Sequence, residues 1–304
     1  MAFTAADVKN LREMTGVGMM DCKKALTESD GNIDKAIEYL REKGLAASAK
    51  KAGRIAAEGM AYACVIDGMG IVVEVNAETD FVGKNEKFVD FVKGVAATVA
   101  ANKPADLDAL MACKYAGSEL TVTEQQQEMV LVIGENIKVR RFFVFEDGVS
   151  VPYIHAGGKI GVLVNLEVSE GIDATEIGKD VAMQIAALNP RFWDKSQVTE
   201  DVLEEEKKIM MVQMANDPKM ANKPEQVREK IVMGKLNKFY SENCLLQQEF
   251  VKDNQFTVEK YIASAAKALG GTITFKSAVR FEKGEGIEKK QENFADEIAK
   301  MVNG

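Results

Sequence analysis

The residues able to perform covalent chemistry in this chain are few and far apart. There is a single histidine, His155, and none of the four cysteines forms a CxxC pair or a cluster at zinc-binding spacing. The run from His155 to Ile160 lacks the Ser or Thr that follows the lysine of a phosphate-binding loop, and the sequence has no GxGxxG, HExxH or GxSxG motif. The sequence therefore favours a binding protein over an enzyme, with no cofactor and no metal. The cysteines are Cys22, Cys64, Cys113 and Cys244.

The segment VEVNAETDFVGKNEKF (73–88) is a candidate for recognition chemistry. Asp80 and Phe81 stand where a strand-like run gives way to a turn. In one interpretation, Thr79 or Asp80 caps the following helix and Phe81 staples that helix to the core. In the other, Phe81 is an exposed wedge, because a rigid aromatic side chain buries a large area in a partner at low entropy cost.

Three further segments have two interpretations each. In TGVGMM (15–20), Met19 and Met20 either fill a small core or contact a partner, and adjacent side chains can hardly both point inward. His155 is more often a structural hydrogen-bonding residue than a catalytic one. The run IGEN (133–136) is typical of an ordinary turn.

The N-terminal residues predict a compact unit of three helices. Thr4 and Asp7 fit a capping box, and a short second helix follows over 21–28. A third helix begins after Asn32 and is predicted to end at Gly44. The Ala-, Lys- and Gly-rich residues 45–59 indicate a partly helical connector.

An α+β region with a weak internal repeat comes next. Residues 61–80 contain two strand-like runs joined at Asp67-Gly68, a strong hairpin signal, and a helix over 88–102 follows. Residues 151–171 and 177–189 repeat the order of strand, turn, strand and helix. Each helix ends just before a proline, so the sequence predicts two related lobes. Between them, 122–146 starts as a helix and finishes as a strand.

The charged residues 199–240 predict a different element. Two helices separated by a loop with Pro218 and Pro224 indicate an antiparallel hairpin that projects from the body. A helix over 261–269, a strand over 272–282 and a last amphipathic helix over 292–302 follow. The hairpin's predicted apolar stripe consists of Leu203, Met210, Val227 and Ile231.

Composition and charge narrow the possible partners and location. The 304 residues are 46% hydrophobic and 28% charged, as in ordinary globular proteins, and the net charge of −8 argues against broad electrostatic binding of nucleic acid. The N-terminus MAFTAADVKN does not read as a signal peptide, and no apolar run is long enough to span a bilayer. We therefore expect a cytoplasmic protein with reduced thiols that binds neither membranes nor nucleic acid directly.

Several motifs occur in an order that resembles one known family. They are LREMTGVGMMDCKKAL, IVVEVNAETDFVGKNEKF, IGENIKVRR, YIHAGGKIGVLV, FVKD and GEGIEKKQENFADEIA. Together they closely resemble the elongation factor Ts family over essentially the whole chain. The resemblance implies a guanine-nucleotide exchange factor of elongation factor Tu in translation elongation (protein biosynthesis), without covalent chemistry.

The resemblance also implies an α+β fold with five parts. These are an N-terminal ubiquitin-associated-like (UBA-like) three-helix module with its connector, two similar core subdomains of antiparallel sheet and helix, a projecting antiparallel helical hairpin and a C-terminal helix module. Their expected boundaries are 1–54 for the N-terminal module, 55–146 for the first subdomain, 147–189 with 241–286 for the second, 190–240 for the hairpin and 287–304 for the C-terminal module.

Residue by residue, the resemblance implies a surface that binds elongation factor Tu in its GDP-bound and nucleotide-free forms. The Asp-Phe pair intrudes between helices of the partner's GTPase domain, and His155 faces the partner's third domain. The hairpin is a dimerisation element in some members, which implies a possible homodimer. The residues carried over are Arg12, Met19, Met20, Thr79, Asp80, Phe81, Val82, Ile133, Gly134 and His155.

This chain departs from the family pattern at Gly83, where members often carry Ala, and at Glu249, where they often carry Pro. Two other functions remain open beside exchange: constitutive binding of elongation factor Tu without efficient exchange, and a scaffold whose N-terminal module binds unrelated helices. A metabolic enzyme ranks last, for want of a recognisable site.

Overall fold

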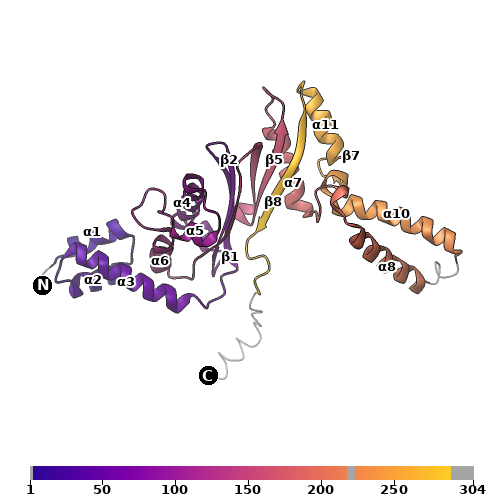
Figure 1. Ribbon diagram of the computed structural model, residues 1–304. Coiled ribbons are helices and arrows are strands. Elements are labelled where there is room, and N and C mark those ends of the chain that lie inside the picture. Colours follow the sequence, from indigo (N-terminus) through magenta and orange to yellow (C-terminus); the bar gives the residue numbers. More distant parts are fainter. Residues whose placement is uncertain (1–2, 218–222, 289–304) are drawn as a thin grey trace.

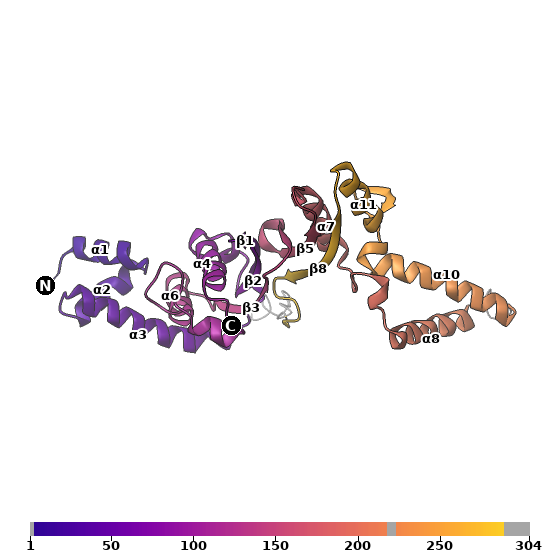
Figure 2. The same ribbon diagram turned by 45° about the horizontal axis from the view of Figure 1, so that its top comes forward.

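The computed structural model describes residues 3–217 and 223–288. The molecule is elongated, with three helices at one end, two small antiparallel sheets in the middle and a helical hairpin at the other end (Figures 1 and 2). The expected mixed α/β architecture with small antiparallel sheets is confirmed. Within the described ranges, no helix combines the length and apolar character needed to cross a membrane.

Three helices form the N-terminal unit. The predicted capping box is present, with the Thr4 hydroxyl accepting from the Asp7 amide and the Asp7 carboxylate accepting from the Thr4 amide. The third helix does not end at Gly44 as predicted. Gly44 is buried, and a β-carbon there would lie 3.4 Å from the Gln127 carbonyl oxygen, so this part of the helix packs closely on the helix that contains Gln127. The helices are α1 (Ala5–Thr15), α2 (Met19–Glu28) and α3 (Ile33–Lys51).

The first lobe is a three-stranded sheet with the order β1-β2-β3, covered on one face by helices. The predicted hairpin turn lies at Asp67-Gly68, where both residues have positive φ as a two-residue turn requires. Apolar side chains of α4 and α6 pack on the sheet. The short helix α5 was not predicted. The elements are β1 (Glu58–Ile66), β2 (Met69–Ala77), α4 (Glu86–Asn102), α5 (Leu107–Ala112), α6 (Val122–Ile133) and β3 (Lys138–Phe145).

The second lobe repeats this plan with the strand order β4-β5-β8. Its helices α7 and α11 pack on the outer face of the sheet. The main helices of both lobes end at a non-glycine residue in the left-handed region, Lys103 and Asn189, each followed by a proline. The elements are β4 (Val149–His155), η2 (Ala156–Gly158), β5 (Ile160–Val168), α7 (Thr175–Leu188), α11 (Val258–Ala268) and β8 (Ile273–Glu282).

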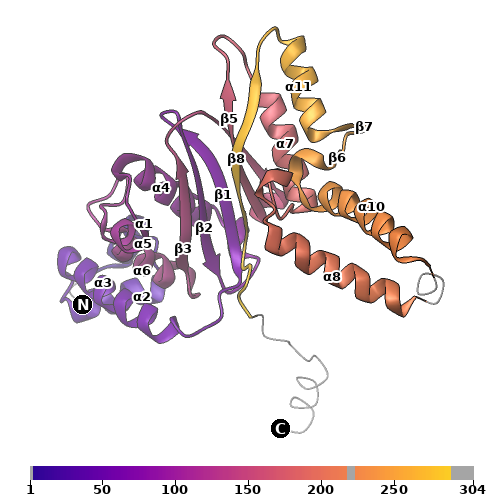
Figure 3. The same ribbon diagram turned by 45° about the vertical axis from the view of Figure 1, so that its right-hand side comes forward.

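The inner faces of the two sheets pack against each other, so the body has helices outside and strands inside (Figure 3). A small apolar cluster of Ala61, Val72 and Leu163 lies between the sheets. This arrangement places β1 and the turn that directly follows Phe81 beside the η2 turn of the second lobe.

A buried carboxylate ties the two lobes together. Glu74 on β2 is fully buried and accepts hydrogen bonds from Arg140 (2.9 Å), Arg141 (2.5 Å), Asn76 (3.0 Å) and the Gly284 amide (2.8 Å). Burial alone would raise the pKa of Glu74, but these four bonds to the charged form outweigh it and hold the pKa below its ordinary value. Since Gly284 follows β8, the bond fastens the end of the second sheet to the first.

The helical hairpin consists of α8 (Glu200–Asn216) and α10 (Glu225–Asn243). Val227 is 40% exposed, so its predicted place in the apolar stripe is wrong. Pro224 caps α10, whereas Pro218 lies outside the described residues, as does the helix expected over 292–302. Two short strands at the hairpin's base, β6 (Glu249–Phe250) and β7 (Asp253–Thr257), were not predicted. The seam between the helices contains Leu203, Met210, Met214, Ile231, Val232 and Leu236.

Candidate partner-binding site

Phe81 is the most exposed large apolar side chain among the described residues, at 80%. The strand β2 ends at Ala77, and a single 3-10 turn, η1 (Val82–Lys84), precedes α4. The side chain of Asn85 caps α4, accepting from the Lys87 amide at 3.0 Å. The interpretation in which Thr79 or Asp80 caps the helix and Phe81 packs in the core is therefore wrong.

The residue after Phe81 anchors the turn. Val82 is 6% exposed and packs in the core of the first lobe, so its side chain anchors the loop. The backbone beside it passes close to β1, where a β-carbon on Gly83 would lie 2.8 Å from the Gly59 carbonyl oxygen. The loop that carries Phe81 is thus pinned immediately after the aromatic residue.

The carboxylate of Glu135 pins the same loop immediately before it. One oxygen accepts from the backbone amides of Glu78 (3.1 Å) and Thr79 (3.0 Å). The other accepts from the Thr79 hydroxyl at 2.7 Å. Glu135 follows the end of α6, where Gly134 takes the left-handed conformation (φ 87°) and turns the chain toward the loop.

Hydrogen bonds are also made in the opposite sense, from the segment after α6 to the residues beside the loop. The Glu78 carboxylate accepts from the Asn136 amide at 2.6 Å and pairs with Arg54 at 3.4 Å. The side chain of Asn136 donates to the Arg54 carbonyl oxygen at 2.8 Å. The run IGEN therefore ends α6 and also supplies the hydrogen bonds of Glu135 and Asn136 that hold the Phe81 loop.

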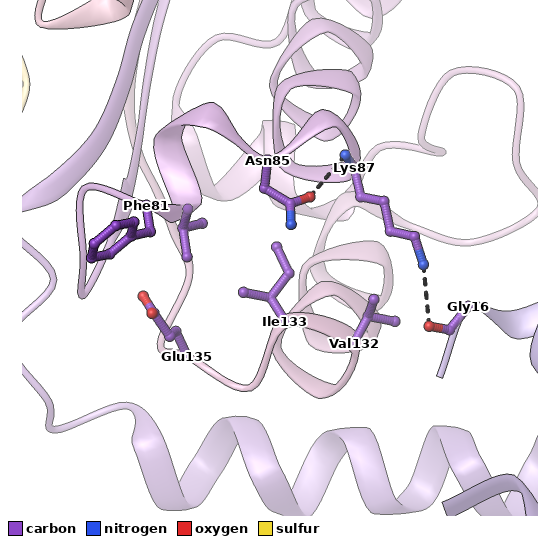
Figure 4. Close-up of a pocket in the computed structure, with 8 residues that line it drawn as sticks. Gly16, Phe81, Asn85, Lys87, Val132, Ile133 and Glu135 are labelled. Atoms are coloured by element: carbon purple, nitrogen blue, oxygen red, sulfur yellow. Dashed lines mark hydrogen bonds between the residues drawn. The ribbon is translucent and has the colours of Figure 1, made fainter. Parts of the chain in front are cut away.

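An open cleft of about 330 Å³ lies between the Phe81 loop and the N-terminal helices. Ile133 and Val132 face its interior, with Phe81 and Glu135 at one side and Gly16 at the other (Figure 4). On the Gly16 side, the ammonium group of Lys87 donates to the Gly16 carbonyl oxygen at 3.2 Å. This bond and the packing of α3 on α6 fix the N-terminal helices relative to the loop.

The N-terminal candidate residues are on the surface. Arg12 is exposed near the end of α1, and the first two residues of α2, Met19 and Met20, are 48% and 75% exposed. Neither methionine fills the small core, which is built from residues such as Leu11 and Leu26. The second helix begins at Met19, two residues earlier than predicted, because Gly18 serves as its N-cap.

His155 lies at the exposed end of β4, and its Nδ1 is 3.0 Å from the Tyr153 hydroxyl. The following turn, η2, packs against η1, so the second lobe contributes a border to the region around Phe81. The structure therefore brings together the loop of Thr79 to Val82, the α6 end at Ile133 and Gly134, and the His155 corner.

Sequence reasoning missed the residues that hold this site in place. Glu135, Glu78 and Lys87 stand inside quoted motifs, yet a lone carboxylate or lysine carries no sequence signal for a long-range bond. The one available hint was the polar run Glu135-Asn136 placed directly after a helix-ending glycine.

Comparison with known proteins finds a matching family model and full-length relatives. The family model described as Elongation factor TS matches residues 78–285. The elongation factor Ts of Syntrophotalea carbinolica is 48% identical, over 99% of this chain and 100% of its own. That of Clostridium botulinum (strain ATCC 19397 / Type A) is 47% identical over 99% and 98%, and that of Clostridium perfringens (strain SM101 / Type A) is 50% identical over 98% of each chain.

These full-length matches define the class of protein as a translation elongation factor. The chain belongs to the elongation factor Ts family, as its motifs indicated.

Proposed function

We propose that this chain is the guanine-nucleotide exchange factor of elongation factor Tu and acts in the cytoplasm during translation elongation. The observation that carries the proposal is the 80% exposure of Phe81 on a loop that is bonded on both sides. An exposed aromatic side chain on a rigid corner is an effective wedge, because little conformational entropy is lost when it enters a partner.

Exchange of this kind requires binding energy and no covalent chemistry. A factor that binds the nucleotide-free GTPase more tightly than the nucleotide-bound form must weaken nucleotide binding by the same ratio. GDP then leaves, GTP binds, and the factor is displaced. The proposal therefore needs no catalytic side chain and no cofactor in this chain.

The wedge acts on the partner's phosphate site. Phe81 and Asp80 enter between helices of the GTPase domain and shift the elements that hold Mg²⁺ and the phosphates. Contacts between charged groups are the strong ones in such sites, so a small displacement weakens GDP binding greatly. Arg12, Met19 and Met20 add a second contact on the GTPase domain, while His155 faces the partner's third domain.

Release of a fluorescent GDP from elongation factor Tu of the same organism tests the proposal. Stopped-flow traces with and without this chain give the rate of release. We expect an acceleration that saturates as the concentration of this chain rises. Binding without any acceleration would reject exchange and favour a constitutive binder. Capture of helical peptides by the chain, with no binding of elongation factor Tu, would favour a scaffold.

The helical hairpin is the proposed dimerisation element. Val212 on α8 and Met233 on α10 are 61% and 62% exposed, so both apolar side chains are accessible to a second copy of the chain. Sedimentation equilibrium of the chain tests this part of the proposal. A mass of one chain at all concentrations would reject the dimer and leave the exchange function untouched.

A further inference from the structure

We propose that Glu135 is a positioning residue for exchange: its carboxylate holds the loop so that Phe81 faces outward. The inference rests on the proposed function, since it names how the wedge is kept ready. It adds a residue that touches neither the nucleotide nor, directly, the wedge side chain.

The bonding of Glu135 is concentrated on the two residues that precede Asp80-Phe81. The backbone amides of Glu78 and Thr79 and the Thr79 hydroxyl all donate to this one carboxylate, at 3.1, 3.0 and 2.7 Å. Bonds to a charged acceptor are shorter and stronger than neutral ones. The carboxylate therefore fixes the direction in which the chain leaves the strand.

The loop needs an external tie at this point. The pairing of β2 with its neighbours ends at Ala77 and Asn76, and turn bonding resumes where the Lys84 amide donates to the Phe81 carbonyl oxygen at 3.2 Å. Residues 78–80 lie between these two regions of backbone bonding. Glu135 supplies acceptors in the gap from a position two residues after the end of α6, a helix whose apolar side chains belong to the lobe's core.

The position of Glu135 is itself fixed by a hydrogen bond of the next residue. The next residue, Asn136, is buried and donates through its amide to the Glu78 carboxylate at 2.6 Å. Each of the two segments thus accepts hydrogen bonds from the other's backbone. A reciprocal clamp of this kind restricts the loop before the partner arrives, which lowers the entropy lost on binding.

The first test is a double-mutant cycle on fluorescent GDP release with Glu135→Ala, Phe81→Ala and the double variant. If Glu135 acts through Phe81, Glu135→Ala lowers the release efficiency about tenfold in the wild-type background and has no effect in the Phe81→Ala background. Additive losses would overturn the inference. Glu146→Ala is the matched control, because Glu146 is a surface carboxylate of the same lobe whose pair with Lys103 (3.3 Å) lies away from the loop.

The second test does not depend on the partner. The full chain is labelled with 4-fluorophenylalanine, and the Phe81 resonance is assigned by its absence in Phe81→Leu. We expect ¹⁹F NMR to show this resonance moving toward the shift of the free amino acid in Glu135→Ala and staying in place in Glu146→Ala. An unchanged resonance in Glu135→Ala would overturn the inference.

The two tests separate the possible failures. If elongation factor Tu releases GDP as fast with Phe81→Ala as with wild type while the ¹⁹F signal responds to Glu135→Ala, the wedge mechanism is wrong. The role of Glu135 in holding the loop is then right. If GDP release is slow with Phe81→Ala but Glu135→Ala changes neither the release rate nor the ¹⁹F signal, the wedge mechanism is right and Glu135 is not the positioning residue of Phe81.

Discussion

The two lobes share one plan but use the corner between strand and helix in opposite ways. After β2, Phe81 points out to solvent, and the carboxylate of Glu135, just after the end of α6, accepts a hydrogen bond from the backbone amide of Thr79. After β5, Ile172 packs against the lobe's own core. There, Ser169 bonds to the Thr272 carbonyl oxygen at the start of the adjacent strand. The second corner is an ordinary closed turn, whereas the first presents an aromatic side chain.

Residues at equivalent positions of β2 and β5 also have different roles in the two lobes. When VEVNAE (73–78) is placed on VLVNLE (162–167), Glu74 corresponds to Leu163 and Glu78 to Glu167. Leu163 is buried between the sheets, whereas Glu74 gathers two arginines and a backbone amide. The exposed Glu167 makes a surface pair with Lys276 at 3.2 Å, whereas Glu78 takes part in the clamp. The first lobe therefore contains polar networks that hold the Phe81 loop and bond to the segment just after β8. In the second lobe, the equivalent residues pack between the sheets or form a surface ion pair.

The largest expected effect comes from Glu74→Ala. It leaves Arg140 and Arg141 without the carboxylate they share and releases the Gly284 amide, so we expect a loss of about 3 kcal/mol in the free energy of unfolding. Urea denaturation measures this. In the control Glu167→Ala, removal of the exposed pair with Lys276 should cost about 0.5 kcal/mol or less. Equal losses in the free energy of unfolding would show that the buried Glu74 network contributes no more to stability than a surface ion pair.

Ile172→Ala is expected to have an intermediate effect. Its side chain is partly buried in the second core, so truncation should cost about 1–2 kcal/mol in urea denaturation. Phe81→Ala should change stability by no more than about 0.5 kcal/mol, because the ring is exposed. If Phe81→Ala proved the more destabilising of the two, the contrast between the corners would be wrong.

The smallest expected effect is an acid dependence of stability that Glu74 supplies. Its folded-state pKa lies below the ordinary value of 4.5. Its contribution is therefore fully present above that value and is lost as the pH falls through the lowered folded-state pKa. Unfolding free energies measured from pH 6 downward should fall less steeply in Glu74→Gln than in wild type. Identical slopes would show that Glu74 does not contribute.

Much of the fold follows from local sequence patterns. The Asp67-Gly68 turn, the Thr4 capping box and the repeated strand–turn–strand–helix order depend on neighbouring residues, so they could be predicted. The end of α3 was misplaced for the converse reason. Gly44 is a helix-ending signal by itself, but contact with α6 keeps it inside the helix.

The same distinction between local and long-range interactions applies to the candidate site. The Asp80-Phe81 pair could be singled out because an aromatic residue at a strand end is locally unusual. Its orientation could not be predicted, because it depends on Glu135, which is 56 residues from Thr79 in sequence. The tie between Glu74 and Gly284 spans 210 residues, so no local pattern contains it.

The measurement that tests the central claim most directly is fluorescent GDP release from elongation factor Tu at saturating concentrations of wild type, Phe81→Ala and Asp80→Ala. An interface anchor removed to Ala typically costs about 2 kcal/mol, so we expect release about 30-fold slower with Phe81→Ala and a weaker loss with Asp80→Ala. Equal release rates for wild type and Phe81→Ala would contradict the account.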